Sequence, residues 1–210
     1  MARTPLSAQQ LFDSSRRCAE VLISEGPDAN TKALVEASGM SERTFFRNFP
    51  TKADCLRPLL VQGLVKFIEG LSRRVREAAR PGSQSTPALI DLVAQSFAEA
   101  YHGESAVVDQ GLADLLVGAA AYRRVWLDMQ QETTEALTPT MARALGLDEE
   151  HIDVRLAAEA ATDLAKESIR LMVSDGLTPA AAAAAVAAAQ RRAPVLRTPA
   201  QLRLQGSLAG

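Results

Sequence analysis

The stretch from Asn30 to Leu56 constrains the fold most, because it carries signals for two short helices joined by a tight turn. Asn30 can accept a hydrogen bond from a first-turn backbone N–H group, which predicts a helix over 31–38. Gly39 can adopt the left-handed conformation that ends a helix at low cost. Ser41 can then cap a second helix over 42–48. The sequence therefore predicts a helix, a short turn and a second helix within this stretch.

The second of these helices carries two kinds of side chain. Its apolar residues, which predict a packed face, are Phe45 and Phe46, with Phe49 just beyond its end. The polar residues, which point elsewhere, are Arg43, Thr44, Arg47 and Asn48. Two short helices joined by a tight turn are typical of the helix-turn-helix motif, whose second helix enters the major groove of DNA. The pattern predicts a DNA-binding module.

Residues 34–56, LVEASGMSERTFFRNFPTKADCL, resemble the signature of the tetracycline-repressor (TetR) family of bacterial transcriptional regulators. That signature runs approximately I-A-x-x-A-G-V-S-x-x-T-[LF]-[YF]-x-[HY]-F-x-S-K-x-x-L. The resemblance implies an all-helical homodimer with an N-terminal three-helix DNA-binding domain and a C-terminal ligand-binding domain. Two positions depart from the pattern. Phe46 stands where tyrosine, which can bond a phosphate, is frequent, and Asn48 stands where histidine or tyrosine is common.

The DNA contacts follow from residue chemistry. Arg43 and Glu42 are the expected base readers, since arginine can pair with guanine through two hydrogen bonds. Lys52 is expected at a phosphate, in the first turn of a helix that begins at Thr51. The remaining candidates are Lys32, Ser41, Thr44, Phe46, Arg47, Asn48 and Thr51. For Phe46, packing competes with DNA contact, and Arg16 and Arg17 are interpreted as a solvated face.

The rest of the chain is expected to be helical, and no segment has the pattern of a strand. A first helix is predicted over 6–25 and a fourth from Thr51 to about Arg80. Later apolar periodicities are those over 88–102, 106–119, 121–144, 149–174 and 178–191. A loop is predicted over 81–87. The predicted domains are 1–52 for DNA binding, 53–193 for ligand binding and dimerisation, and 194–210 as a tail.

Two further surfaces are predicted in the C-terminal part. The large side chains expected to line a pocket for a hydrophobic or amphipathic effector are Phe67, Phe97, Tyr101, Trp126 and Met129. The residues expected at a homodimer interface, on smooth helices that allow close approach, are Leu156, Ala160, Leu164, Ser168, Leu171, Ala184 and Ala188. Each of these residues is also compatible with ordinary core packing.

Charge and composition narrow the function classes. Residues 1–80 contain 13 lysines and arginines against 9 aspartates and glutamates, whereas residues 81–210 contain 10 against 16. This division suits an N-terminal module that meets phosphate. The first ten residues lack the apolar segment of a signal peptide, which predicts a cytoplasmic protein with reduced Cys18 and Cys55 and no membrane partner.

No nucleophile motif, phosphate-binding glycine loop or histidine–cysteine cluster is present, so neither an enzyme nor a cofactor is expected. The sequence thus predicts a homodimeric repressor that binds a palindromic double-stranded DNA operator and is released by a small molecule. The alternatives are a regulator of the same fold without such an effector, acting as an activator or through a protein partner, and a helical enzyme or carrier. Redox sensing through the two cysteines also stays open.

Overall fold

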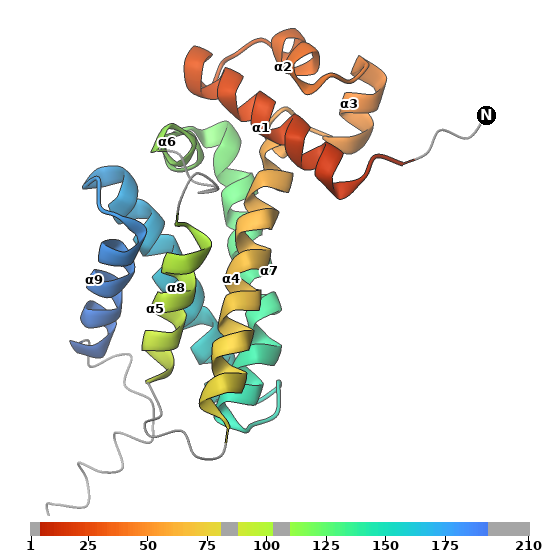
Figure 1. Cartoon of the computed structure of the whole chain (residues 1–210). Coiled ribbons are helices and arrows are strands. Elements are labelled where there is room, and N and C mark those ends of the chain that lie inside the picture. Colours follow the sequence, from red (N-terminus) through yellow and green to blue (C-terminus); the bar gives the residue numbers. More distant parts are fainter. Residues whose placement is uncertain (1–4, 81–87, 103–109, 193–210) are drawn as a thin grey trace, which may run out of the picture. The chain divides into compact units, whose positions relative to one another are not determined.

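The computed structural model describes residues 5–80, 88–102 and 110–192, and all regular structure in this part is helical (Figure 1). The predicted all-α class is confirmed. The predicted loop over 81–87, the first residues of the helix predicted over 106–119 and the predicted tail over 194–210 lie outside the described residues.

The first three helices are α1 (Ala8–Glu25), α2 (Thr31–Ser38) and α3 (Glu42–Asn48). Their ends follow the predicted signals. The Asn30 side chain accepts a hydrogen bond from the backbone N–H of Lys32 at 2.9 Å, and Gly39 ends α2 with φ +71°. The Ser41 hydroxyl accepts from the backbone N–H of Thr44 at 3.4 Å. The two helices and the turn between them are therefore confirmed.

The fourth helix does not begin at Thr51, as predicted. Residues Ala53–Leu56 form a 3-10 helix, η1, and α4 runs over Arg57–Ala78. Pro58 explains the interruption, because proline has no N–H and its ring clashes with the carbonyl four residues earlier unless it lies in a first turn. The Thr51 N–H and hydroxyl both donate to Asp54 Oδ2, at 2.7 and 2.8 Å, and stabilise the turn before η1.

The remaining helices are α5 (Leu89–Ala100), α6 (Gln110–Gly118), α7 (Ala120–Leu145), α8 (Ile152–Ser174) and α9 (Pro179–Arg192). These bounds lie close to the predicted periodic stretches. The last helix opens as predicted, since the Thr178 hydroxyl accepts from the backbone N–H of Ala181 at 3.2 Å and Pro179 occupies the first helical position. None of the described helices combines the length and apolar character needed to cross a bilayer.

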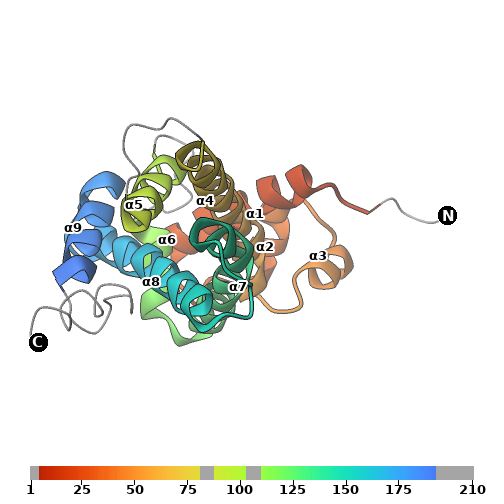
Figure 2. The ribbon, with the colours of Figure 1, turned by 90° about the horizontal axis from the view of Figure 1, so that it is seen from below.

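Contacts divide the chain into two compact units. The first comprises residues 1–66 and 103–131, and the second comprises 67–102 and 132–210. Both α4 and α7 run from one unit into the other. In the second unit α9 packs on α5 and α8, and α5 also contacts α8 (Figures 1 and 2). The predicted boundary at 52/53 falls within the first unit. A division by contacts is not a division by function, so the predicted domains stay predictions.

Each unit has its own apolar core. In the first unit the fully or almost fully buried side chains include Cys18, Leu22, Leu34, Phe45, Phe49, Cys55 and Leu56. In the second they include Phe67, Leu71, Phe97, Leu137, Met141, Val154 and Leu164. Phe45 and Phe49 pack edge to face, with ring centroids 5.1 Å apart, and seat α3 on the core of the first unit.

Candidate nucleic-acid interface

The turn between α2 and α3 is fixed by polar groups of α1. The Ser14 hydroxyl donates to the carbonyl of Ser38 at 2.8 Å. Arg17 donates from Nη2 to the same carbonyl at 2.8 Å and from Nε to the carbonyl of Ala37 at 2.6 Å. These carbonyls lie at the C-terminal end of α2, where a helix leaves its acceptors unpaired and where a cation is favourable. The direction in which α3 leaves the turn is therefore tied to α1.

Arg17 is exposed, as a solvated face requires, but its guanidinium is hydrogen-bonded within the protein. Its guanidinium also lies 3.2 Å from the Ser14 hydroxyl, so three of its bonds converge on α2 and α1. The neighbouring Arg16 is exposed, and its side chain makes no hydrogen bond or ion pair within the described residues, in agreement with the prediction for that residue. No local pattern distinguishes the two arginines, since the acceptors of Arg17 lie about 20 residues further along the chain.

The ten residues predicted to contact DNA fall into two groups. One group has side chains hydrogen-bonded within the protein and consists of Ser41, Thr44, Asn48, Thr51 and Lys52. The Ser41 hydroxyl donates to the Thr44 hydroxyl at 2.9 Å, and the Asn48 amide donates to the Thr44 carbonyl at 2.7 Å. These side chains cap or brace α3 and the turn after it. Their main role in this structure is to hold the helix in place.

The other group is exposed and consists of Lys32, Glu42, Arg43, Phe46 and Arg47. Within the described residues, none of the four charged side chains in this group makes a hydrogen bond or an ion pair. Four of the five lie on α3. Phe46 is 40% exposed, whereas Phe45 and Phe49 are 0% and 2% exposed, so the predicted apolar face of the helix does not include Phe46. The outward face of α3 thus offers two arginines, one carboxylate and one aromatic ring.

Lys52 is held by the loop between α1 and α2. Its Nζ donates to the carbonyl of Pro27 at 2.8 Å and to that of Ala29 at 3.0 Å. The Tyr122 hydroxyl, from the N-terminal part of α7, donates to the same Pro27 carbonyl at 3.1 Å. Burial, followed by the nearby Cys55 and Asp28, raises the pKa of Tyr122 to about 12, so this hydroxyl stays a donor at neutral pH. One carbonyl thus joins three segments of the first unit.

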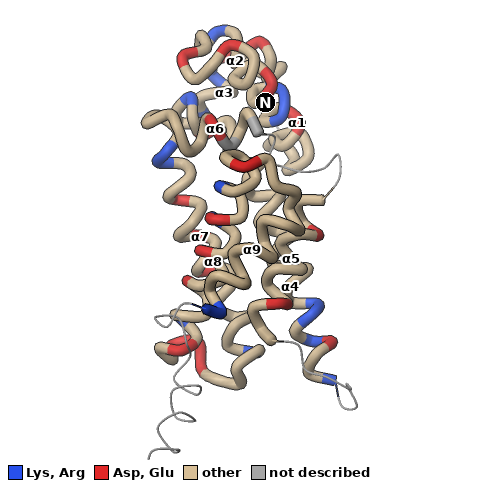
Figure 3. Tube along the Cα trace, turned by 90° about the vertical axis from the view of Figure 1, so that its left-hand side faces the viewer, with Lys and Arg blue, Asp and Glu red and all other residues tan. Residues whose placement is uncertain are grey.

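Net charge does not mark this interface. Residues 1–56 contain seven lysines and arginines and seven aspartates and glutamates, and both signs are interspersed along α1–α3 (Figure 3). The basic surplus predicted for residues 1–80 lies in 57–80, where six lysines and arginines stand against two glutamates. On α3, Arg43 and Arg47 are both exposed and lack a carboxylate partner in the described part of the chain.

The residues predicted to line an effector pocket divide between the units. Phe67, Phe97 and Tyr101 are buried together in the second unit, with Phe67–Phe97 centroids 6.2 Å apart and Phe97–Tyr101 centroids 4.5 Å apart. Burial raises the pKa of Tyr101 to about 12. Met129 is buried and Trp126 is half-buried in the first unit. The three aromatic residues form a packed cluster, and the pocket stays a prediction.

Burial within the second unit removes two residues from the predicted dimer interface. Leu164 and Ser168 are 0% exposed within the second unit, so they are core residues. The remaining candidates keep exposed area and are Leu156, Ala160, Leu171, Ala184 and Ala188. The sequence missed Ile152, which is 57% exposed one turn before Leu156, itself 56% exposed. These two large apolar side chains lie at i and i+4 on α8.

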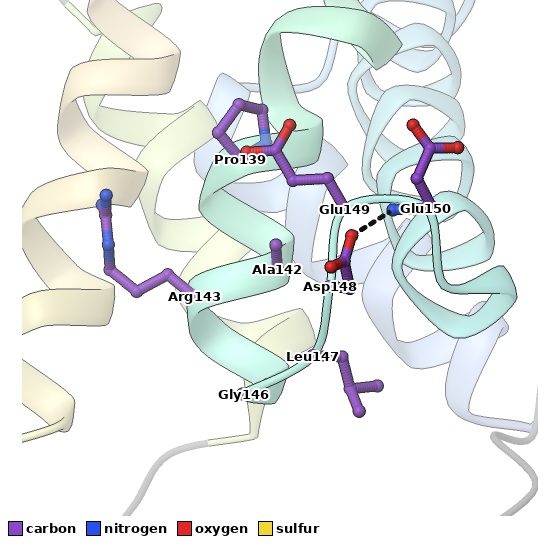
Figure 4. Close-up of a pocket in the computed structure, with 8 residues that line it drawn as sticks. All are labelled: Pro139, Ala142, Arg143, Gly146, Leu147, Asp148, Glu149 and Glu150. Atoms are coloured by element: carbon purple, nitrogen blue, oxygen red, sulfur yellow. Dashed lines mark hydrogen bonds between the residues drawn. The ribbon is translucent and has the colours of Figure 1, made fainter.

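Other chemical features offer no reactive site among the described residues. A surface hollow of about 710 Å³ at the α7–α8 turn is lined by Arg143 and by exposed carboxylates, with the Glu150 N–H donating to Asp148 Oδ1 at 3.1 Å (Figure 4). No group of three or more potential metal ligands is found there or elsewhere in the described part. Cys18 and Cys55 are buried free thiols, and a hydrogen bond to Cys18, together with burial, raises the pKa of Cys55.

Known proteins offer no further guide to this interface. No protein-family model matches the sequence, and none of the curated proteins is similar to it. The family resemblance of residues 34–56 therefore stays a prediction.

Proposed function

We propose that this chain is a DNA-binding transcriptional regulator whose α2, turn and α3 form a helix-turn-helix. The observation that carries the proposal is the outward face of α3, where Arg43 and Arg47 are exposed and have no carboxylate partner in the described part of the chain. Phe45 and Phe49 seat the opposite side of the helix on the core. A short helix held firmly with unpaired guanidinium groups outward suits base edges and phosphates of a major groove.

The proposed role of each side chain follows from whether it is hydrogen-bonded within the protein. Arg43 and Glu42, in the first turn of α3, are the base readers, since arginine pairs with guanine and glutamate accepts from cytosine. Arg47 and Lys32 contact phosphates. Arg17 and Lys52 hold the motif in shape through backbone carbonyls and do not themselves need to touch DNA.

We propose that the regulator acts as a homodimeric repressor in the cytoplasm. One recognition helix reads only a few base pairs, whereas two helices about 34–36 Å apart read both halves of a palindrome. Ile152 and Leu156 support the dimer, because two large apolar side chains more than half exposed on one helix gain from being covered. The exposed alanine side of α9 permits close approach of a second helix.

Release from DNA by a small hydrophobic or amphipathic effector is part of the same proposal. It needs a link between the effector-binding part and the recognition helix. The Tyr122–Pro27 hydrogen bond supplies a candidate link, since it ties α7 to the loop before α2. An effector acts through such a link only if it binds more tightly to the conformation that fits DNA poorly.

The test is selection of binding sites from a random duplex pool by the purified full-length protein, read by sequencing. We expect a palindrome whose half-site centres lie about one helical turn apart. The Arg43→Ala variant, carried through the same selection, is expected to lose preference at specific positions of each half-site. Absence of enrichment at low salt would reject the proposal.

A further inference from the structure

Phe46 is the exposed member of the three phenylalanines at 45, 46 and 49. It lies on the short helix α3, yet 40% of its surface is exposed while Phe45 and Phe49 are buried. Its ring meets the ring of Phe45 edge to face, with centroids 5.4 Å apart and an interplanar angle of 86°. One part of the ring is therefore fixed against the core, and the rest is presented to the outside.

The helix geometry places this ring among the proposed DNA contacts. With about 100° of rotation per residue, Phe46 lies about 40° from Glu42 and about 60° from Arg43 around the helix. Arg43 and Arg47 are both exposed, and Arg47 lies about 100° from Phe46 around the helix. The ring thus forms an apolar spot on a face that otherwise carries charged groups.

The chemistry of the major groove restricts what such a spot can meet. Each base pair presents hydrogen-bond donors and acceptors there, and the apolar group that distinguishes one base from the others is the 5-methyl of thymine. A phenylalanine ring has no hydroxyl, so it cannot hydrogen-bond a phosphate as a tyrosine does. We propose that Phe46 is a specificity-determining residue that contacts the 5-methyl group of a thymine, so that each half-site of the operator selects a T·A pair at one position.

This inference rests on the proposed function, because it requires α3 to enter the major groove. It goes further by assigning one base-pair preference to one side chain. The preference depends on a methyl group and not on hydrogen bonding, and that property can be removed without disturbing base pairing.

The test uses deoxyuridine, which pairs as thymine does but lacks the methyl group. Each thymine of the selected site is replaced in turn, and the dissociation constant is measured by fluorescence anisotropy for the wild type and for Phe46→Ala. At one thymine per half-site we expect about fourfold weaker binding by the wild type, the factor that corresponds to about 0.8 kcal/mol for one buried methylene-sized group. The Phe46→Ala variant is expected to bind both duplexes equally.

Phe46→Leu serves as the matched control, because leucine keeps an apolar side chain and should keep part of the sensitivity to the methyl group. Circular dichroism verifies that both variants retain their helices. The inference is overturned if the wild type binds the selected site but no single deoxyuridine weakens binding, or if Phe46→Ala stays as sensitive as the wild type. Both results leave DNA binding itself intact. If no DNA is enriched at all, the proposed function fails and this inference fails with it.

Discussion

The α1–η1 region and the second unit of this protein use their cations differently. Of the six lysines and arginines described in the α1–η1 region, none forms an ion pair with a carboxylate. Arg17 and Lys52 donate to backbone carbonyls, and Lys32, Arg43 and Arg47 have no side-chain partner in the described part. In the second unit, five of the ten described lysines and arginines pair with carboxylates, as Arg73 and Arg74 do with Glu99.

The difference separates two functions of positive charge. A cation that faces a carboxylate can join two helices, as Arg191 of α9 does with Asp91 of α5, or brace one helix, as Lys166 does with Asp163 within α8. A cation without a carboxylate partner remains able to bind an external anion. Because residues 1–56 carry equal numbers of basic and acidic residues, net charge alone would have hidden this capacity. The pairing of each charge is the more informative quantity.

The largest effect is expected from Arg17→Ala, which removes a cation that stabilises the fold. Three hydrogen bonds to the end of α2 and to Ser14 are lost, although the Ser38 carbonyl keeps the Ser14 hydroxyl as a donor. Hydrogen bonds to charged groups contribute about 1.5–3 kcal/mol. We expect a loss of that order in the free energy of unfolding, measured by urea denaturation, and weaker binding to every DNA sequence.

Arg16→Ala is the matched control for this prediction, since Arg16 is adjacent and exposed. It should leave the free energy of unfolding nearly unchanged. Arg17→Lys should recover little of the stability, because an ammonium group cannot reproduce the planar fork of the guanidinium. Equal stability of Arg17→Ala and Arg16→Ala would mean that the contacts with α2 contribute nothing.

The next effect is expected from Arg43→Ala, which removes a cation kept for an external partner. Unfolding should be unaffected, while the preference for the selected site over a scrambled duplex should fall by about 1–3 kcal/mol. Arg155→Ala is the control, because Arg155 is equally exposed and unpaired in the described residues but lies on α8. If both variants lose the same affinity, lack of a partner rather than position on α3 determines the effect.

Lys52 could belong to either class of cation, those that stabilise the fold or those that are available to DNA. As a phosphate contact it would contribute to the salt dependence of DNA binding, with a slope change of about 0.9 in log K against log salt. The structure instead engages its ammonium group with two carbonyls, so we expect Lys52→Met to lower the free energy of unfolding by about 1–2 kcal/mol and to leave the salt slope unchanged.

Lys32→Met provides the comparison, since the Lys32 side chain is exposed and has no partner in the described part. This variant should reduce the salt slope and preserve stability. A reduced slope for Lys52→Met would show that Lys52 releases its carbonyls on DNA and reaches a phosphate after all.

Much of the fold was predictable because its signals are local. The caps at Asn30 and Ser41, the left-handed Gly39 and the opening of α9 at Thr178 depend on groups within four residues of each other. Such bonds are specified by neighbouring residues alone. The predicted helix start at Thr51 was wrong for a local reason as well, because Pro58 seven residues later favours a helix that has this proline in its first turn.

The long-range contacts were not predictable. The acceptor of Tyr122 lies 95 residues away, and the backbone carbonyls that accept from Lys52 and Arg17 lie at least 20 residues away. The residue type of a donor does not indicate which distant carbonyl will accept its hydrogen bond. In α8 and α9 alanine covers several sides of each helix, so periodicity could not decide that Leu164 and Ser168 face inward while Ile152 and Leu156 face outward. That choice depends on which neighbour packs against which side.

The smallest effect concerns the paired cations of the second unit and depends on pH. Hydrogen bonds first from Arg73 and then from Arg74 lower the pKa of the Glu99 carboxyl below its ordinary value. A carboxyl whose pKa is lower in the folded state stabilises that state above its unfolded pKa, and the stabilisation is lost as the pH falls through the folded pKa. Because the Glu99 side chain is 49% exposed, we expect only about 0.2–1 kcal/mol at neutral pH. Glu99→Gln should therefore be slightly less stable than the wild type at pH 7 and equally stable in acid where the carboxyl is protonated.

Glu159→Gln, at an exposed glutamate of α8 without an ion-pair partner in the described residues, should match the wild type at both pH values. A pH-independent difference for Glu99→Gln would assign its effect to packing instead of to the ion pairs, and would remove Arg73 and Arg74 from the contrast between the α1–η1 region and the second unit.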